Sequence, residues 1–401
     1  MKRAATTLAL AVAAALGLGA CTASPEPAPT PTATVAPTGD GVLRIGTAFS
    51  LKKSSKASGA AQVAGVELAV RDINRAGGIN GVPIEVFHRD GADAESFPAL
   101  VEKGVDVVIG ASSDDIADEL APLATEAGIP LISAAATFAD PSAFTFSTAP
   151  SNAGVIAATV AGLVEAEVTS ATYVRFDNDE STQFEYDLRP ALADAGISFD
   201  PVHPFGVSDA RTDAELVIYE VTALRPGAVI FAGPASEESG TIIAALSEAG
   251  YGGEKLWLTG DAVRQWKKPV AAASLDGAHG TTRASRMDGA FTALLEQTDP
   301  SLTSTEFAAE AYDATVLAAL AATLASDDGG PSIAHQLRAA SAGGIQCSSF
   351  AECLDVLATE PDIDYVGRSG PVDLDADGNG GAATSASFVF SSGNKPTLVE
   401  K

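Results

Sequence analysis

The stretch GVELAVRDINRAGGINGVP, residues 65–83, decides the fold of this chain. Its apolar residues recur with the spacing of one helix face, at Val66, Ala69, Val70 and Ile73. Gly77 and Gly78 can adopt the left-handed backbone that ends a helix, and Asn80–Gly81 predicts a turn directly after it. The stretch therefore predicts an amphipathic helix that packs on a sheet. The residues expected to face water are Glu67, Arg71 and Asp72.

Strand-like segments lie on both sides of this helix. Residues 43–47 precede it and residues 84–87 follow it, and each is a short run rich in apolar side chains. A strand, a helix and a second strand in this order predict a β-α-β unit with parallel strands and a right-handed crossover.

The same alternation of strand and helix recurs along the rest of the chain. Residues 105–109 form a nearly continuous apolar run, as expected of a strand buried on both faces, and residues 114–127 carry a helical stripe. Further strands are predicted at residues 131–133, 171–176, 228–232 and 256–258. Two successive sets of this kind predict an α/β fold with two doubly wound lobes.

The first residues have the features of an export signal. A basic pair precedes an apolar run, residues 8–18, that is too short to span a bilayer. The segment Leu18–Cys21 resembles a lipobox, which predicts a lipoprotein signal peptide over residues 1–20 and lipidation of Cys21. Ordinary cleavage that leaves Cys21 as a free thiol is the alternative.

Residues 21–41 are mostly Ala, Pro, Thr and Ser. Such a segment cannot bury a core, and it predicts an extended tether between the membrane and the folded part. No later segment has the length of a transmembrane helix, and residues 316–324 are interpreted as the end of an amphipathic helix. We therefore expect a protein that is lipid-anchored at the extracytoplasmic face of the cell membrane.

The chain is strongly acidic. Its 401 residues include 24 basic and 52 acidic side chains, for a net charge of −28. Nucleic acid is not an expected partner because its phosphates would be repelled, and self-repulsion favours a soluble monomer. A cationic ligand is one interpretation of this charge, and a solvated acidic surface is the other.

Motifs of catalysis and cofactor binding are missing from the sequence. There is no G-x-S-x-G elbow, no P-loop and no G-x-G-x-x-G after the first strand, and the histidines have no metal-ligand spacing. Residues 373–379 imitate half of a calcium loop, but Thr384 stands where the bidentate glutamate belongs, which favours a turn. We expect no enzyme activity, no cofactor and no metal.

The phrase GVELAVRDINRAGGINGVPIEV resembles the signature of the branched-chain amino-acid-type (Leu/Ile/Val-binding) substrate-binding proteins of ABC transporters. The likeness continues, in the same order, at residues 107–113, 127–137, 146–150 and 310–321. The resemblance implies the periplasmic-binding protein type I fold, a membrane permease as partner, and capture of a small-molecule ligand by closure of two lobes.

The resemblance also implies lobes that are not contiguous in sequence, because the chain crosses between them three times. The N-terminal lobe would comprise residues 42–150 plus 281–367, and the C-terminal lobe residues 151–280 plus 368–401. The last strands, near residues 371–374 and 387–390, would then belong to the C-terminal lobe.

Ligand contacts carry over from the family onto two segments. Ala135 and Ala136 would offer backbone groups, and Thr137 its hydroxyl and amide. Asp261 stands where the family has an acidic residue that pairs with the ammonium group of the ligand. The alternatives are a helix N-cap for Thr137 and a turn residue for Asp261.

Other positions depart from the family pattern. Asp114 stands where the family has a hydroxyl that binds the ligand carboxylate, and an anion there would repel that carboxylate. Either Ser112 or Ser113 takes the role through a shifted loop, or the ligand is not an ordinary amino acid.

The aromatic residues that close over the ligand in the family are also replaced. Spacing puts Ser58, Ser181 and Pro234 at their places, and either Phe184 or Tyr186 could compensate. The first loop carries Lys52, Lys53 and Lys56, which would meet an anionic ligand or would simply be solvated.

Cys347 and Cys353 form an even, closely spaced pair once Cys21 is set aside, and in an exported chain this pair predicts a disulfide. Many lipoproteins of the resembled family have a disulfide at this position. Zinc is a poor rival because no histidine is near.

The sequence therefore predicts the solute-binding lipoprotein of an ABC importer, with an amino acid or a related amine or amide as ligand. The alternative is a ligand-sensing or adaptor lipoprotein of the same fold that acts on a membrane receptor or on cell-wall machinery. An enzyme is the third and most remote interpretation.

Overall fold

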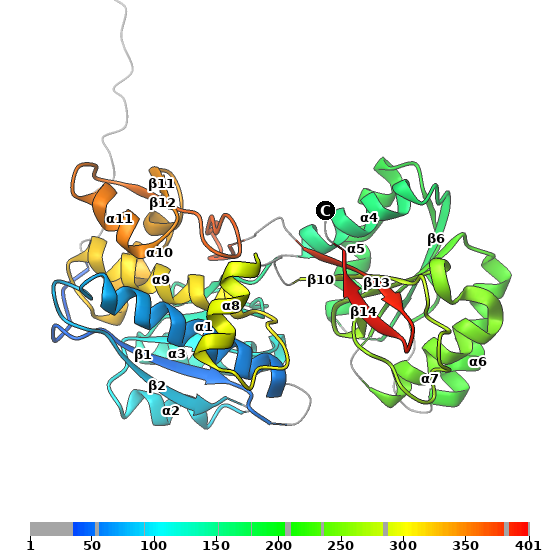
Figure 1. Cartoon of the computed structure of the whole chain (residues 1–401), viewed down its shortest axis with the longest axis horizontal. Helices are drawn as coiled ribbons and strands as arrows, with labels where there is room; N and C mark the ends of the chain where they lie inside the picture. The colour runs from blue at the N-terminus through cyan, green and yellow to red at the C-terminus, as the bar shows by residue number, and fades with distance from the viewer. Residues whose placement is uncertain are drawn as a thin grey trace, which may run out of the picture. The chain divides into compact units, whose positions relative to one another are not determined.

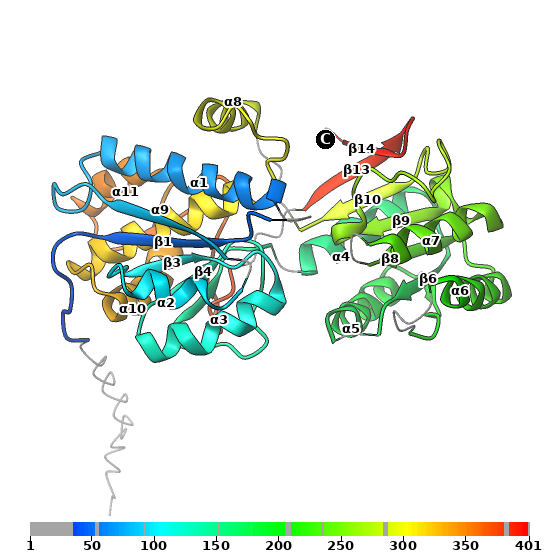
Figure 2. The same cartoon turned by 90° about the horizontal axis from the view of Figure 1, so that it is seen from below.

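The computed structural model describes residues 35–52, 56–91, 93–150, 152–177, 179–204, 210–233, 236–283, 288–380 and 385–399. Ala36–Lys401 is a compact unit by itself and contains two α/β lobes, each built on its own sheet (Figures 1 and 2). The predicted signal peptide and Cys21 lie outside the described residues.

The first lobe is built on a five-stranded sheet with the order β2-β1-β3-β4-β5, and all its neighbouring strands are parallel. The strands are β1 (Arg44–Phe49), β2 (Glu85–Asp90), β3 (Val107–Gly110), β4 (Leu131–Ser133) and β5 (Thr145–Ser147). The predicted β-α-β unit is confirmed, because α1 (Lys56–Arg75) connects the parallel strands β1 and β2. Gly77 and Gly78 end α1 with φ of 112° and 69°, as the sequence predicts.

Helices cover both faces of this sheet (Figure 2). One core joins it to α1, α8 (Gly289–Thr298), α9 (Ala308–Ala325), α10 (Gly330–Ser341) and α11 (Phe350–Leu357). A second core joins the other face to α2 (Ser96–Val101) and α3 (Asp114–Ala127). Consecutive strand residues such as Val107 and Val108 belong to different cores, as expected of a sheet buried on both sides.

The apolar face of α1 is buried as predicted, but its other face does not simply meet water. Glu67 lies 2.6 Å from His88 Nε2, Arg71 donates to Thr298 at 3.1 Å, and Asp72 accepts from Tyr312 at 3.1 Å. These three side chains are half-buried because α8, α9 and β2 also pack around α1.

Helix α9 is buried all round, so the interpretation of residues 316–324 as the end of an amphipathic helix is wrong. Among the described residues it is the one helix long and apolar enough to cross a membrane, and 83% of it is buried inside the protein. Its alanine-rich surface lets neighbours approach closely, and a Cβ atom at Gly65 of α1 would lie 2.1 Å from the carbonyl oxygen of Ala308. Such a helix is the core of a lobe rather than one of its surface layers.

The second lobe is built on a seven-stranded sheet with the order β14-β13-β10-β9-β8-β6-β7. Its strands are β6 (Ser170–Arg175), β7 (Ser198–Phe199), β8 (Ala228–Ala232), β9 (Leu256–Thr259), β10 (His279–Thr282), β13 (Ala386–Ser391) and β14 (Lys395–Leu398). Only β13 and β14 run antiparallel to their neighbours. The helices on its faces are α4 (Asn152–Glu165), α5 (Asp179–Asp194), α6 (Ala210–Leu224) and α7 (Glu237–Leu246).

The chain leaves the first lobe later than predicted. Val372 and Leu374 belong to the core of the first lobe, and Asn379 forms a bridge to Ser147 in β5. The expectation that residues 371–374 join the second lobe is therefore wrong, although residues 387–390 do so as part of β13. The segment belongs to the first lobe because its apolar side chains pack in the core of that lobe and its bridge partner is in β5.

The end of the predicted tether is held by the first lobe. Gly39 N donates to Asp327 at 2.9 Å, and Gly41 N donates to Asp328 at 3.0 Å. Both carboxylates follow α9, so the backbone before β1 is fixed beside the C-terminal end of that helix.

Candidate functional site

The carboxyl ends of β3 and β4 bring together two of the predicted ligand segments. After β3, Ser113 is the extended N-cap residue of α3, and the amide groups of the first helical turn carry positive partial charge. After β4, the loop continues through Thr137. The two loops are in contact, because Thr137 N donates a hydrogen bond of 2.8 Å to Asp114 Oδ1.

Asp114 is the first helical residue of α3, and its side chain is 26% exposed. Its second oxygen, Oδ2, lies 3.6 Å from Arg283 Nη2, whose side chain is 18% exposed. One helical turn later, Asp118 accepts from Ala139 N at 3.0 Å. The two carboxylates of α3 thus hold the loop that follows β4.

The two serines beside Asp114 have different surroundings. Ser112 Oγ accepts a hydrogen bond of 2.9 Å from Ser50 N, and Ser113 is exposed. Of these three side chains, Asp114 is the one that accepts the hydrogen bond from the Thr137 amide.

The backbone of Ala135 and Ala136 is engaged within the lobe. Ser133 Oγ accepts from Ala136 N at 2.9 Å and from Ala135 N at 3.4 Å, and Ala136 O accepts from Ser147 Oγ at 2.8 Å. Both alanines are buried, whereas Thr137 is half-buried. No helix of the described chain begins at Thr137, so the alternative interpretation as an N-cap is wrong.

Asp261 lies on a different element, the short 3₁₀ helix Gly260–Ala262 that follows β9, and it is exposed. Its carboxylate affects the pKa of Glu306, which lies in the turn before α9. Burial, and after it the Asp261 carboxylate, raise the pKa of Glu306 from 4.5 to about 7, while Arg283 acts in the opposite direction. Asp114, Arg283, Glu306 and Asp261 therefore form a chain of neighbouring charges with three acids and one base.

Arg283 and Glu306 were not predicted as site residues. Each belongs to a connection between secondary structure elements, Arg283 directly after β10 and Glu306 directly before α9. Neither belongs to a motif, and they follow Asp114 by 169 and 192 positions in the sequence. Only the folded chain shows that they are neighbours.

The residues that replace the closing aromatic side chains differ in burial. Ser181 is buried in α5, and Pro234 is outside the described residues. Phe184 is buried in the second lobe against Tyr173, with ring centroids 5.6 Å apart, and Tyr186 is 66% exposed.

Two predicted polar groups of the first lobe have partners of their own. Ser58 Oγ accepts from Gln62 Nε2 at 3.2 Å, and Lys52 pairs with Asp90 at 2.8 Å. Lys56 is exposed, and Lys53 lies outside the described residues.

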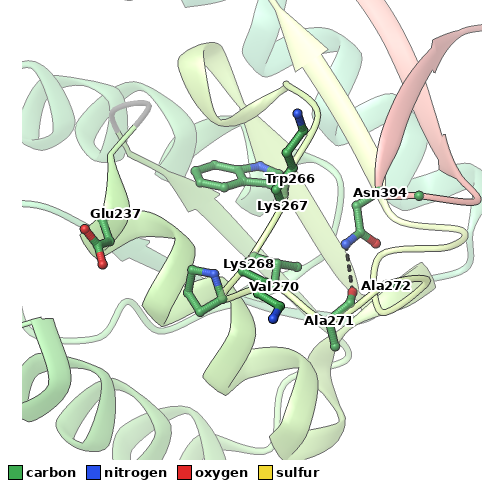
Figure 3. A pocket seen from close by; sticks show the side chains of 10 residues that line it. Glu237, Trp266, Lys267, Lys268, Val270, Ala271, Ala272 and Asn394 are labelled. Atoms are coloured by element: carbon green, nitrogen blue, oxygen red, sulfur yellow. Dashed lines mark hydrogen bonds between the residues drawn. The ribbon is translucent and has the colours of Figure 1, made fainter.

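A surface cavity formed by described residues lies outside this site. It has a volume of about 770 Å³ and lies in the second lobe beside Trp266, Lys267 and Lys268, where Asn394 bonds the carbonyl of Ala271 (Figure 3). A second cavity, of about 290 Å³, is lined in part by Asp72, Tyr312 and Arg368 of the first lobe. None of the predicted ligand residues lines either cavity.

The part of the chain that the structure describes contains no group of three or more His, Cys, Asp or Glu side chains able to hold a metal ion. Within the calcium-like segment, Asp375 Oδ1 accepts from the amides of Asp377 and Asn379, both at 2.9 Å. This carboxylate therefore stabilises the turn of its own segment.

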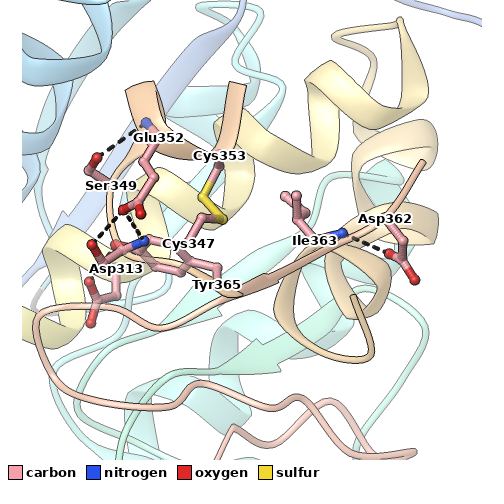
Figure 4. Close-up of a disulfide and its surroundings, with 9 residues drawn as sticks. Asp313, Cys347, Ser349, Glu352, Cys353, Asp362, Ile363 and Tyr365 are labelled. Carbon is pink, nitrogen blue, oxygen red and sulfur yellow. Dashed lines mark hydrogen bonds between the residues drawn. A yellow bond between two sulfur atoms is a disulfide. The ribbon is translucent and has the colours of Figure 1, made fainter. Parts of the chain in front are cut away.

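A disulfide joins Cys347 and Cys353 beside a two-stranded sheet of the first lobe (Figure 4). The strands of this sheet are β11 (Ile345–Cys347) and β12 (Ile363–Tyr365). Next to it, the fully buried Asp313 of α9 accepts from the Tyr365 hydroxyl and from Arg368 N, both at 2.8 Å, and from Ser369 N at 2.7 Å. Burial raises the pKa of Asp313, and these hydrogen bonds oppose the increase.

Two lobes of parallel α/β architecture, with polar groups at the carboxyl edge of the first sheet, define the class of two-lobed solute-binding proteins. The chain belongs to the periplasmic binding protein family, whose sequence profile matches residues 42–346. No curated protein sequence matches it.

Solved structures of ABC transporter substrate-binding proteins share this fold. The branched-chain amino acid binding protein LivJ from Streptococcus pneumoniae, solved with isoleucine, is 20% identical with a TM-score of 0.65, and the match covers 90% of this chain and 100% of LivJ. A protein from Desulfitobacterium hafniense solved with Leu is 18% identical with a TM-score of 0.67, covering 89% and 99%. A benzoate complex from R. palustris is 18% identical with a TM-score of 0.61, covering 90% and 96%. The chain thus has the type I periplasmic-binding protein fold.

Proposed function

We propose that this protein is the solute-binding lipoprotein of an ABC importer. It is anchored as a monomer through Cys21 at the extracytoplasmic face of the cell membrane, and it captures a small amine-bearing or amide-bearing solute. The observation that carries the proposal is the match of residues 42–346 to the family together with the polar edge at Asp114 and Thr137. The solved relatives bind isoleucine, leucine or benzoate, which supports a small organic solute here.

Binding acts through closure of the two lobes. The solute contacts the edge of the first sheet, and Asp261 of the second lobe then pairs with its amine. Because the closed arrangement makes contacts that the open one lacks, the solute shifts the population towards closure, and the permease recognises that state.

Small-angle scattering on the compact unit Ala36–Lys401 tests closure. Its radius of gyration should fall when a solute that raises the unfolding temperature is added. A solute at about a hundred times its dissociation constant stabilises by about 2.7 kcal/mol, so a thermal-shift screen identifies it. An unchanged radius of gyration with a stabilising solute would refute closure as the mechanism.

Anchoring is tested separately on the full chain. Metabolic labelling with a fatty acid should mark the protein, and Cys21→Ser should abolish the label and release the protein from membranes. A labelled Cys21→Ser variant would overturn the assignment of the anchor.

A sensory or adaptor lipoprotein remains a second candidate because Asp114 departs from the family pattern. Co-purification distinguishes the two: an importer component is recovered with a permease and an ATPase, whereas a sensor is recovered with a kinase or a cell-wall synthase. We expect no turnover of bound solute in either case.

A further inference from the structure

We propose that Asp114 itself fills the carboxylate subsite of this protein, so that the solute is an organic amine cation without a carboxylate group. The inference rests on the proposed solute-binding function and names the chemical class of the solute.

The backbone donors of the loop after β4 are already used. By the resemblance to the family, Ala135, Ala136 and Thr137 would offer backbone groups to the solute. Here Asp114 Oδ1 takes the Thr137 amide at 2.8 Å, and Ser133 Oγ takes the amides of Ala136 at 2.9 Å and Ala135 at 3.4 Å. Three consecutive amides thus have acceptors from the same lobe.

The other groups that would attract an anion, the N-terminus of α3 and a nearby arginine, already interact with the Asp114 carboxylate. Asp114 is the first helical residue of α3, so its carboxylate meets the positive end of the helix dipole. The nearest cation, Arg283, lies 3.6 Å from its second oxygen. A second carboxylate at this place would compete for one N–H group and would be repelled by the first.

The neighbouring charges suit a cation. Glu306 and Asp261 are close enough to influence one another, and Arg283 is the one cation among the charges that act on Glu306. Both carboxylates can accept hydrogen bonds from an ammonium group, a charge-assisted contact that is among the strongest in proteins.

Asp118 allows a purely structural role of Asp114 to be tested, because it makes a similar hydrogen bond. Asp118 belongs to the same helix and also accepts an amide of the loop, Ala139 N at 3.0 Å. Among the ion pairs of the described residues, however, only Asp114 is paired with Arg283. Asp118→Ser is therefore the matched control, since it removes a similar bond and leaves the proposed subsite intact.

Isothermal titration of Ala36–Lys401 with matched compounds tests the proposal. The panel contains leucine, leucinamide and 3-methylbutylamine, then lysine and cadaverine, ornithine and putrescine, and benzoate and benzylamine. The wild-type protein should bind only members without a carboxylate. Asp114→Ser should raise the affinity for the matching amino acid about ten- to a hundred-fold, the value of one hydrogen bond to a charged group, and Asp118→Ser should not.

The outcomes separate the two claims. Binding of an amino acid or of benzoate by the wild-type protein overturns the inference and leaves the proposed function standing. Equal changes in selectivity with Asp114→Ser and Asp118→Ser also overturn it, because the effect would then come from the loop. If neither the wild-type protein nor Asp114→Ser binds any compound of the panel, the result counts against the proposed function itself. Asp114→Asn, which keeps an acceptor for Thr137, serves if the serine variant does not fold.

Discussion

Replacing Glu306 by glutamine should remove a pH dependence of stability that the wild-type protein has. The pKa of Glu306 is raised to about 7 in the folded protein, whereas 4.5 is its ordinary value. Between these values the folded protein holds a proton that the unfolded chain has lost. The stabilisation is therefore complete below pH 4.5 and is lost as the pH rises through about 7.

The size of the effect follows from the same two values. At about 1.36 kcal/mol for each pKa unit, the full interval corresponds to about 3 kcal/mol. Glu306 is partly exposed, and between pH 5 and pH 8 only part of the interval is sampled. We expect the wild-type protein to lose about 2 kcal/mol relative to Glu306→Gln over this range.

Urea titrations of both proteins at pH 5 and pH 8 measure the difference in the free energy of unfolding. Burial also raises the pKa of Asp106 to about 7, but Asp106 is present in both proteins and cancels. Glu296→Gln, at an exposed position of α8, is the control. If the difference between wild type and Glu306→Gln is the same at both pH values, the electrostatic account of this cluster is refuted.

Three further substitutions have defined outcomes. Replacing Cys347 and Cys353 by serine opens a loop with a sequence separation of 6 and should cost about 2 kcal/mol in urea unfolding; no loss would mean that the pair is not bonded in solution. Asp313→Asn places an amide NH₂ against buried donors and should cost about 2–4 kcal/mol, whereas Asp355→Asn at an exposed site should cost nothing measurable. Asp261→Ala should abolish binding of an amine-bearing solute in calorimetry with little change in the unfolding temperature, and unchanged affinity would remove Asp261 from the site.

Much of the architecture was predictable from local patterns. The helix at Val66–Ile73, its glycine stop and the parallel strands beside it follow from spacing and backbone preference. The centre of the first lobe did not follow, because α9 is apolar on every side and its short apolar run resembled one face of a surface helix. The placement of Val372 and Leu374 in the first lobe depends on packing in its core, on the bond from Leu374 N to Ser341 Oγ and on the bridge between Asn379 and Ser147, and no periodicity records such contacts.

The sequence allowed the position of the candidate site on the first sheet to be predicted, but not the charged residues that surround it. Asp114 and Thr137 follow neighbouring parallel strands, whose carboxyl ends meet at one edge of the sheet, and the structure joins them by a hydrogen bond. The charged neighbours of this edge, Arg283 and Glu306, come from distant connections. Their role depends on the path of the backbone, which side-chain spacing alone does not reveal.

The burial of α9 also bears on how this protein is made. Its family works outside the cytoplasm, so the chain must cross a membrane, and an unfolded segment of this length and apolar character could lodge there. Asp313 and Glu310 lie in the N-terminal third of the segment, and a carboxylate inside a membrane span is unfavourable. We therefore expect the carboxylate that fixes residues 365–369 in the folded lobe also to oppose retention of this segment in lipid during export.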